Sequence, residues 1–540
     1  MKVIKRDGRA VEYNNNKIKI AIEKANQEVT QEKRATVQEI NQITEYIETL
    51  DKKRILVEDI QDIIEQKLME IGRYDLAKKY IVYRYTRALV RKQNTTDESI
   101  LGLIKNASSV SINGEDTPII ASVQRNLIAG EVSKDLTKRM LLPEKITKAH
   151  EDGVIHFHAT DYFLQPIINS CLVNIGDMLD NGTVINGQDI ETPKSFQVAC
   201  IVTTQIIAAI ASSQYGEQYI NIKHLGKYLR KSYEKFKTEL KEFENELSEE
   251  CIEKLVNKRL RNELIAGVQT IQYQINTLIT TYGKAPIVTL ILELDEKDEY
   301  IKENMMIVKE ILKQRVEEMK KNHLVGKEFS KFICKFISDF QDEELINLAK
   351  ECNAQVNPQD VENYQYEGHF NQGVVSINLP QIAINSNKDE KVFWQLLDER
   401  LEICYDALMC RHYALLGIMS DVSPIHWQNG AIARLQANEK IDRLLKDGYS
   451  DITLGYIGLE QTVKMMLGDL YEEQSERNKL NGKVIKVLED KVQKWKKMTG
   501  INFVVCEDED VESCFRLFEV DIVRYGRLLE ENGIVDYELF

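Results

Sequence analysis

The 540-residue sequence contains nine cysteines, but no two of them form a C-x-x-C pair. Cysteines at that spacing are typical of zinc knuckles and thioredoxin-like redox sites, so neither kind of site is encoded. The odd number of cysteines also disfavours a scaffold held together by disulfides. The sequence therefore predicts no metal site and no structural disulfide framework.

Long apolar runs and an excess of positive charge are missing as well. No run approaches the roughly 20 residues that cross a bilayer, and the first residues lack the apolar core of a signal peptide. The net charge of −15 argues against a nucleic-acid-binding protein, because such proteins neutralise phosphates with lysine and arginine. We expect a cytoplasmic enzyme or regulator, with neither a membrane nor a nucleic acid as partner.

Common phosphate-binding and nucleophile motifs are also absent. The chain has no G-x-G-x-x-G and no G-x-S-x-G, and Gly326-Lys327 lacks the upstream glycine of a P-loop. His156 and His158 alternate along a predicted strand and face one side, as metal ligands can, but no third ligand accompanies them at a suitable spacing. We interpret both histidines as structural or pocket-lining.

The first 26 residues carry the clearest positive signal. Two short strands, at Val3–Ile4 and Val11–Tyr13, flank Asp7-Gly8, a dipeptide typical of tight hairpins. Asn14 to Asn16 offer helix caps, and a helix follows whose apolar residues recur on one face: Ile18, Ala21, Ile22 and Ala25. Lys17 lies in its first turn, where the helix dipole favours negative charge, so a bound anion such as phosphate explains this lysine better than helix stability does.

Periodicity predicts two domains joined by a linker. Two further helices complete residues 1–93, and the polar stretch 94–99 breaks the helical pattern. From residue 100 to residue 540, helical stretches alternate with strand-like runs at 154–157, 287–292, 374–379, 452–456 and 501–505. Such alternation is typical of an α/β architecture. The charged stretch 223–261 predicts one or two exposed helices.

Residues 1–93 resemble the ATP-cone, a regulatory nucleotide-binding domain found at the front of many ribonucleotide reductases. The segments VIKRDGR, NKIKIAI and DLAKKYIVYRYTRA match that family in sequence and order. The resemblance implies that ATP or dATP binds as an effector, held by Val3, Lys5, Arg6 and Lys17. It also implies that this domain is small and mostly helical.

The rest of the chain resembles the catalytic domain of anaerobic (class III) ribonucleoside-triphosphate reductases. The match is carried by SVQRNLIAGEVSKDL, by LLPEKITKAHEDGVIHFHATDYFLQPIINSCLVNIGDMLDNGTVING, by PKSFQVACIVTTQIIAAIASSQYGEQ and by GVVSINLPQIAI, and it continues through SPIHWQNGAIARL and SDITLGYIGLEQTV. The resemblance implies a ten-stranded α/β barrel and a homodimer.

In that family, a glycyl radical oxidises a cysteine on a loop inside the barrel, and the thiyl radical takes hydrogen from the ribose. By resemblance, Cys171 corresponds to a second cysteine that joins the reduction, although a single cysteine is usually an inert apolar side chain. Asn371 matches an asparagine of the family motif and can contact a ribose or cap a turn. Cys352 matches a cysteine upstream of the loop and is not assigned the thiyl role.

Several family features are replaced in this chain. The stretch NPQDVENYQYEGHFNQGVVSINLP is shortened and has no cysteine where the family carries Met-Gly-Cys-Arg. The chain stops at Phe540, before the family's zinc site and Arg-Val-Cys-Gly-Tyr motif, so we expect neither zinc nor a glycyl radical. Ala159 replaces an aspartate, Glu217 replaces a glycine, and Lys284 to Ile287 replace Gln-x-Pro-Phe. A carboxylate at position 217 would repel a triphosphate.

Three hypotheses follow from this pattern. The first is a catalytically degenerate, regulatory reductase-like protein whose ATP-cone still binds ATP or dATP. The second is a catalytic barrel subunit whose radical domain is supplied by another chain. The third is a structural partner that forms mixed dimers with an intact reductase. The missing loop cysteine favours the first over the second, because a radical domain can be supplied in trans more easily than an internal thiol.

Overall fold

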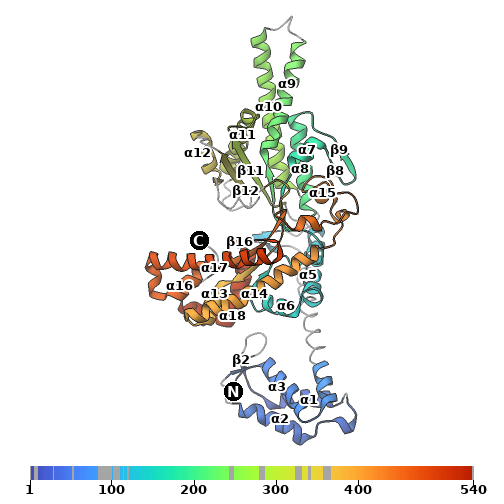
Figure 1. Ribbon diagram of the computed structural model, residues 1–540, viewed down its shortest axis with the longest axis vertical. Helices are drawn as coiled ribbons and strands as arrows, with labels where there is room; N and C mark the ends of the chain where they lie inside the picture. The colour runs from blue at the N-terminus through green and yellow to red at the C-terminus, as the bar shows by residue number, and fades with distance from the viewer. Residues whose placement is uncertain are drawn as a thin grey trace. The chain divides into compact units, whose positions relative to one another are not determined.

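The computed structural model describes residues 2–4, 10–27, 29–50, 54–82, 96, 100, 110–112, 115–117, 121–242, 248–278, 286–322, 331–337, 342–356, 366–534 and 536–537. The chain divides into two compact units: residues 1–110 with 519–531, and residues 111–518 with 532–540 (Figure 1). Each unit has a hydrophobic core of its own.

The N-terminal unit combines a three-stranded sheet with helices. Strand β1 (Lys2–Ile4) pairs antiparallel with β2 (Ala10–Glu12) and parallel with β3 (Arg54–Leu56). The helices are α1 (Asn15–Gln27), α2 (Val37–Thr49), α3 (Val57–Glu70) and a helical stretch over residues 74–82. The predicted strands and the first helix are confirmed, whereas the predicted Asp7-Gly8 turn lies outside the described residues.

Apolar spacing explains how these helices pack. Their buried residues are Ile18, Ile22 and Ala25 on α1, Ile40, Ile43 and Ile47 on α2, and Ile60, Ile64 and Leu68 on α3. Helix α2 starts with a capping box, in which Thr36 accepts a hydrogen bond from the backbone of Glu39 and Glu39 accepts one from the backbone of Thr36. Arg73 then pairs with the same glutamate and links the end of α3 to the start of α2.

The second unit is built on a mixed sheet of nine described strands. Its order is β13-β12-β11-β10-β7-β14-β15-β16, with β6 also paired to β14. The strands from β13 to β7 run parallel, as do those from β14 to β16, and the two groups meet in an antiparallel pairing between β7 and β14. The strand bounds are β6 (Ile155–Phe157), β7 (Ser170–Val173), β10 (Gln218–Asn221), β11 (Val288–Asp295), β12 (Lys331–Ile337), β13 (Gln355–Val356), β14 (Phe370–Asn378), β15 (Ser450–Ile457) and β16 (Asn502–Glu507).

The strand count differs from the ten-stranded barrel that the resemblance implied. Nine strands belong to the sheet in the described ranges, and no described pairing joins its ends, β13 and β16. Strand β6 pairs with one end of β14 and β7 with the other, so two short strands share a single edge of β14. The α/β class is confirmed, and so are the predicted strands that became β6, β11, β14, β15 and β16.

Helices connect and cover the strands. Before β14 they are α5 (Ala121–Leu136), α6 (Glu144–Glu151), α7 (Ile175–Asn181), α8 (Phe196–Ala211), α9 (Gly226–Lys241), α10 (Glu249–Thr277), α11 (Ile301–Asn322) and α12 (Glu343–Glu351). After β14 they are α13 (Leu379–Ser386), α14 (Glu390–Leu415), α15 (Pro424–Trp427), α16 (Leu459–Leu467), α17 (Gln474–Thr499) and α18 (Val511–Glu531). Two small hairpins pair β4 (Val110–Ile112) with β5 (Glu115–Thr117) and β8 (Thr183–Ile185) with β9 (Gln188–Ile190).

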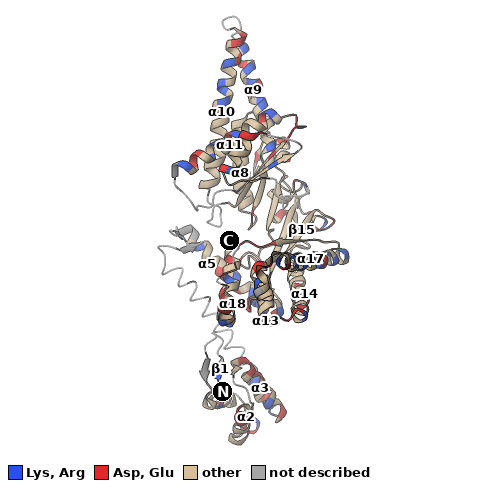
Figure 2. Cartoon of the chain, turned by 90° about the vertical axis from the view of Figure 1, so that its left-hand side faces the viewer, with Lys and Arg blue, Asp and Glu red and all other residues tan. Residues whose placement is uncertain are grey.

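Helices α9 and α10 occupy the charged stretch 223–261, for which one or two exposed helices were expected, and α10 continues to Thr277. Their far ends project from the unit as a hairpin (Figure 1), and charges of both signs lie along it (Figure 2). A small apolar cluster of Leu240, Ile252 and Val256 holds the two helices together there. None of the helices in the described ranges has both the length and the apolar character needed to cross a bilayer.

Candidate functional site

The nucleotide site expected in the N-terminal unit is only partly described. Val3 is buried in the core of this unit, within β1. Lys17 is exposed in the first turn of α1, a turn that contains no acidic residue. Lys5 and Arg6 lie outside the described residues. The two described candidates are therefore a buried strand residue and an exposed cation close to the start of a helix.

The sheet of the second unit has one apolar and one polar face. Cys171, Gln218 and Val288 stand in one row across β7, β10 and β11, and residues of this row belong to a core shared with α8, α10 and α11. Side chains alternate between the faces of a strand, so their neighbours point the other way. We call this second side the polar face; among its residues are Ser170, Tyr219, Thr289, Asn371 and Asp451.

Cys171 and Asn371 are adjacent in the sheet but do not share a face. The register pairs Phe370 with Cys171 and Asn371 with Ser170, so Ser170 is the β7 side chain on the side of Asn371. The Cys171 thiol is fully buried and donates to Gln214 Oε1 at 3.2 Å. Burial raises the pKa of this thiol above its ordinary value, which keeps it protonated and unreactive. The structure therefore does not bring the two catalytic candidates together.

Asn371 caps no turn, in contrast to one of its two expected roles. It lies within β14, and its amide nitrogen donates to Asp451 Oδ1 at 2.5 Å and to Thr453 Oγ1 at 2.7 Å. Its oxygen accepts a hydrogen bond from Asn169 at 3.1 Å. A register shift in the pairing with β15 directly follows it, between Asn371 and Val374. The side chain is thus the centre of a buried polar cluster.

Glu217 accepts hydrogen bonds from two neighbours on the polar face. Tyr219 donates to its Oε2 at 2.8 Å, and Thr289 donates to its other oxygen. The preceding Gly216 approaches Asn169 so closely that a Cβ there would lie 2.3 Å from Asn169 Oδ1. The Glu217 carboxylate is therefore held between two strands, close to the segment that supports Asn371.

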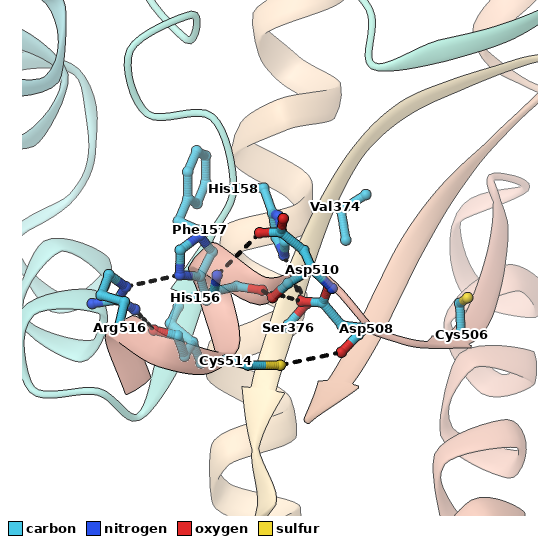
Figure 3. Close-up of polar contacts among 12 residues, drawn as sticks. His156, Phe157, His158, Val374, Ser376, Cys506, Asp508, Asp510, Cys514 and Arg516 are labelled. Carbon is cyan, nitrogen blue, oxygen red and sulfur yellow. Dashed lines mark hydrogen bonds and ion pairs between the residues drawn. The ribbon is translucent and has the colours of Figure 1, made fainter. Parts of the chain in front are cut away.

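A third polar cluster ties β6, β14 and β16 together (Figure 3). His158 Nε2 lies 2.8 Å from Asp508 Oδ2 and 2.9 Å from Ser376 Oγ, and Ser376 donates to the same aspartate oxygen at 2.6 Å. Burial alone raises the pKa of Asp508, but the neighbouring His158 and the hydrogen bonds outweigh burial, so this pKa lies below its ordinary value. Asp508 is therefore ionised at neutral pH.

His156 serves a different partner from His158, although the two rings lie 4.4 Å apart on one side of the strand. Arg516 of α18 donates to His156 Nδ1 at 2.8 Å, and also to the carbonyls of His150 and Ile155. Burial and the nearby positive charges hold the pKa of His156 well below its ordinary value, so the ring is neutral and can accept this hydrogen bond. Both histidines support the interpretation as structural residues. Within the described ranges, no three His, Cys, Asp or Glu side chains are placed to hold a metal ion.

Asp451 and Asp508 were not identified as site residues from the sequence. The predicted strand started at residue 452, which left Asp451 outside it, whereas β15 starts at Ser450 and buries this aspartate to 4% exposure. Asp508 follows β16 directly, where an acidic residue normally indicates a solvated loop. In both cases the only available signal was an acidic residue bordering an apolar strand.

Comparisons with known proteins find a matching family for each of the two units. Residues 114–537 match the family model described as anaerobic ribonucleoside-triphosphate reductase, and residues 1–89 match the ATP cone domain. The anaerobic ribonucleoside-triphosphate reductase of Haemophilus influenzae is 32% identical, over 99% of this chain and 80% of the relative. The Escherichia coli enzyme of the same name is 30% identical, over 97% and 78%.

Solved structures support the same fold. The anaerobic ribonucleotide reductase of Thermotoga maritima, in complex with dATP and CTP, matches with a TM-score of 0.55 and 12% identity, over 77% of this chain and 73% of that one. At this identity the likeness concerns the fold alone. Taken with the family models and the relatives, the chain belongs to the anaerobic ribonucleoside-triphosphate reductase family and carries an N-terminal ATP cone.

Proposed function

We propose that this chain is a catalytically degenerate, regulatory member of its family, which binds ATP or dATP through residues 1–93 and does not reduce ribonucleotides on its own. Residues 94–99 act as the linker, and residues 100–540 form the reductase-like domain, which takes part in regulation or complex formation in the cytoplasm. Radical reduction of a ribose needs a thiol held at the substrate. The placement of the cysteines is the observation that carries the proposal.

All nine cysteines fall within the described residues. On the strands β7, β10, β11, β12, β14 and β15, the cysteines are Cys171 and Cys334, and both point into the helix-covered core. Cys506 shares a row with Gly455 and Ser376, but it lies on β16, at one end of the sheet order, where it is exposed. The other six lie in helices or directly after one. No buried thiol therefore accompanies Asn371 on the polar face.

ATP or dATP as effector is supported by two observations. The exposed Lys17 stands in a helical turn without acidic residues, where a phosphate would be stabilised by the lysine and the helix dipole together. Residues 1–89 also match the family model of the ATP cone domain. We assign the nucleotide to Val3, Lys5, Arg6 and Lys17.

A second candidate is a barrel subunit that reduces ribonucleoside triphosphates with a radical domain supplied by another chain. It is favoured by the 32% identity to a relative named as a reductase over 99% of this chain. Either role is compatible with a homodimer or with a mixed dimer formed with an intact reductase, in which this chain would be a structural partner. The ten-stranded barrel and the homodimer that the resemblance implies remain part of both proposals.

An anaerobic activity assay tests the degenerate and the regulatory parts of the first proposal. The purified chain is incubated with CTP, ATP, reductant, S-adenosylmethionine and a radical-generating activase, with and without an intact reductase. We expect no dCTP from the chain alone, and a changed rate when it is added to the intact enzyme. Formation of dCTP by the chain alone would refute the degenerate assignment, and an unchanged rate in the mixture would refute the regulatory one.

A further inference from the structure

Asn371 has no hydrogen-bond donor left for a ligand. Its amide carries two hydrogens, and the structure directs them to Asp451 and Thr453. The carbonyl oxygen of the same amide accepts from Asn169. All three groups reached by Asn371 belong to the protein itself, so a ligand that accepts a hydrogen bond from this amide must displace Asp451 or Thr453.

Of the three residues bonded to Asn371, Asp451 is the one that can gain or lose a charge. It is 4% exposed, and within the described residues its carboxyl pairs with no lysine or arginine. Burial raises the pKa of Asp451 to about 7, while the hydrogen bond from Asn371 acts in the opposite direction. The carboxyl group therefore changes its charge close to neutral pH.

The titratable neighbours of Asp451 keep their charge over the same range. His369 Nδ1 lies 3.9 Å from Asp451 Oδ2, and burial lowers the pKa of His369 to about 4. Burial, with smaller contributions from Tyr449 and Asp451, raises the pKa of Tyr366 to about 12. On the two flanking strands, Asp451 is paired with the uncharged Asn371 and Asn502. Between pH 6 and pH 8.5, Asp451 is thus the group in this cluster that titrates.

We propose that Asp451 is a positioning residue that acts as a proton-controlled latch on the Asn371 amide. When Asp451 is ionised, it withholds this amide from a hydroxyl-bearing ligand such as a ribose. When Asp451 is protonated, it releases the amide. Hydrogen bonds to an ionised acceptor are roughly twice as strong as those between neutral groups. Protonation therefore weakens the hold on Asn371 and adds an O–H donor on the polar face. Amide, hydroxyl and carboxyl groups together can both donate to and accept from sugar hydroxyls. The inference goes beyond the proposed function, which places nucleotide binding in the N-terminal unit.

Calorimetric titration of the full chain at pH 6.0 and pH 8.5 tests the latch, with ATP saturating the ATP cone. CTP is the probe, and 2′,3′-dideoxy-CTP has the same triphosphate titration without the two ribose hydroxyls. For a group that titrates near pH 7, the protonated fraction of Asp451 falls about 30-fold over this range, and the Kd for CTP should rise by up to the same factor. The dideoxy analogue should bind weakly, with a much smaller pH dependence.

Asp451→Asn is the decisive variant, because it is isosteric and permanently neutral. It should bind CTP with nearly equal affinity at both pH values, whereas Asp189→Asn, at an exposed position of β9, should keep the wild-type profile. A flat wild-type profile, an unchanged slope in Asp451→Asn, an equal slope for the dideoxy analogue or the absence of CTP binding at both pH values would each overturn the latch. None of these outcomes depends on dCTP formation, so the proposed function is tested separately.

A stability measurement shows whether Asp451 titrates in the folded chain. A carboxyl whose pKa is higher in the folded state binds more protons there, so stability falls as the pH rises from about 4 to about 7. In Asp451→Asn, the urea midpoint should lose this part of its pH dependence. An identical pH dependence in both proteins would overturn the assignment.

Discussion

Single side chains in this protein take their role from the face on which they lie. Cys171 and Ser170 are adjacent in the sequence, yet one is buried against helices and the other shares a row with Asn371. His156 and His158 point to the same side but serve Arg516 and Asp508 respectively. A sequence motif therefore shows which segment forms a site, whereas the strand pairing of that segment decides which of its residues can contact a ligand.

In the N-terminal unit, Lys17 is the described residue most directly open to a test. Replacing it with alanine removes a charge from the first turn of α1 and should weaken ATP and dATP binding about tenfold, equivalent to about 1.4 kcal/mol. Isothermal titration calorimetry measures the effect. Lys24→Ala, in the last turn of the same helix, is the matched control and should bind like the wild type. Wild-type affinity in Lys17→Ala would remove this residue from the site.

At the scale of elements, the half-buried charges of Asp508 and Arg516 attach the strand β16 and the helix α18 to the segment around β6. Asp508 follows β16 and accepts hydrogen bonds from His158, Ser376 and Ser513. Arg516 of α18 donates a hydrogen bond to the backbone carbonyl of Ile155 in β6. Ser376 faces Gly455 on β15, where a Cβ would lie 2.1 Å from its oxygen, so the glycine permits this approach. These polar contacts fix the positions of β16 and α18 against β6 and β14.

Asp508→Asn should destabilise the second unit at neutral pH by about 1.5 to 3 kcal/mol, the range for hydrogen bonds to charged groups. The pKa of Asp508 is lowered in the folded state, so its contribution is full above the unfolded pKa of about 3.9 and is lost as the pH falls through the folded value. Urea unfolding at pH 7 and pH 3 should therefore show a difference that shrinks in acid.

The control for this prediction is Asp490→Asn, at an exposed position of α17. It should leave the unfolding midpoint within about 0.5 kcal/mol of the wild type. A difference between wild type and Asp508→Asn that stays constant down to pH 3 would contradict the electrostatic explanation.

At the scale of the whole molecule, the chain consists of two units with separate cores. The core of the N-terminal unit is formed by residues from Val3 to Tyr80, and the large core of the second unit by residues from Ile168 onward. Units with separate cores can unfold in separate steps. A ligand that binds one folded unit stabilises that unit.

Differential scanning calorimetry should accordingly resolve two transitions for this chain. ATP at 100 times its Kd should stabilise the unit that binds it by about 2.7 kcal/mol and should shift one transition while leaving the other in place. Lys17→Ala should reduce the shift. Equal shifts of both transitions would contradict the assignment of ATP to the N-terminal unit.

Much of the fold was predictable because local patterns determine it. The apolar stripe of α1, the charged hairpin of α9 and α10, and five strands of the large sheet follow from periodicity. Short or irregular strands such as β7, β10 and β13 were not predicted, since a few residues carry too little periodic signal. The expected number of ten strands came from the family resemblance, whereas the described residues form a sheet of nine strands.

The sequence by itself determined the family, the identity of each polar residue and those helices and strands that carry a clear periodic pattern. Tertiary structure alone decided that Ser170 rather than Cys171 faces Asn371, and that Asp451 captures the amide of Asn371. The physical reason is register: a one-residue shift in pairing turns every side chain of a strand to the other face. Contacts between residues 80 positions apart, such as Asn371 and Asp451, likewise arise only when β14 and β15 pair in the folded sheet.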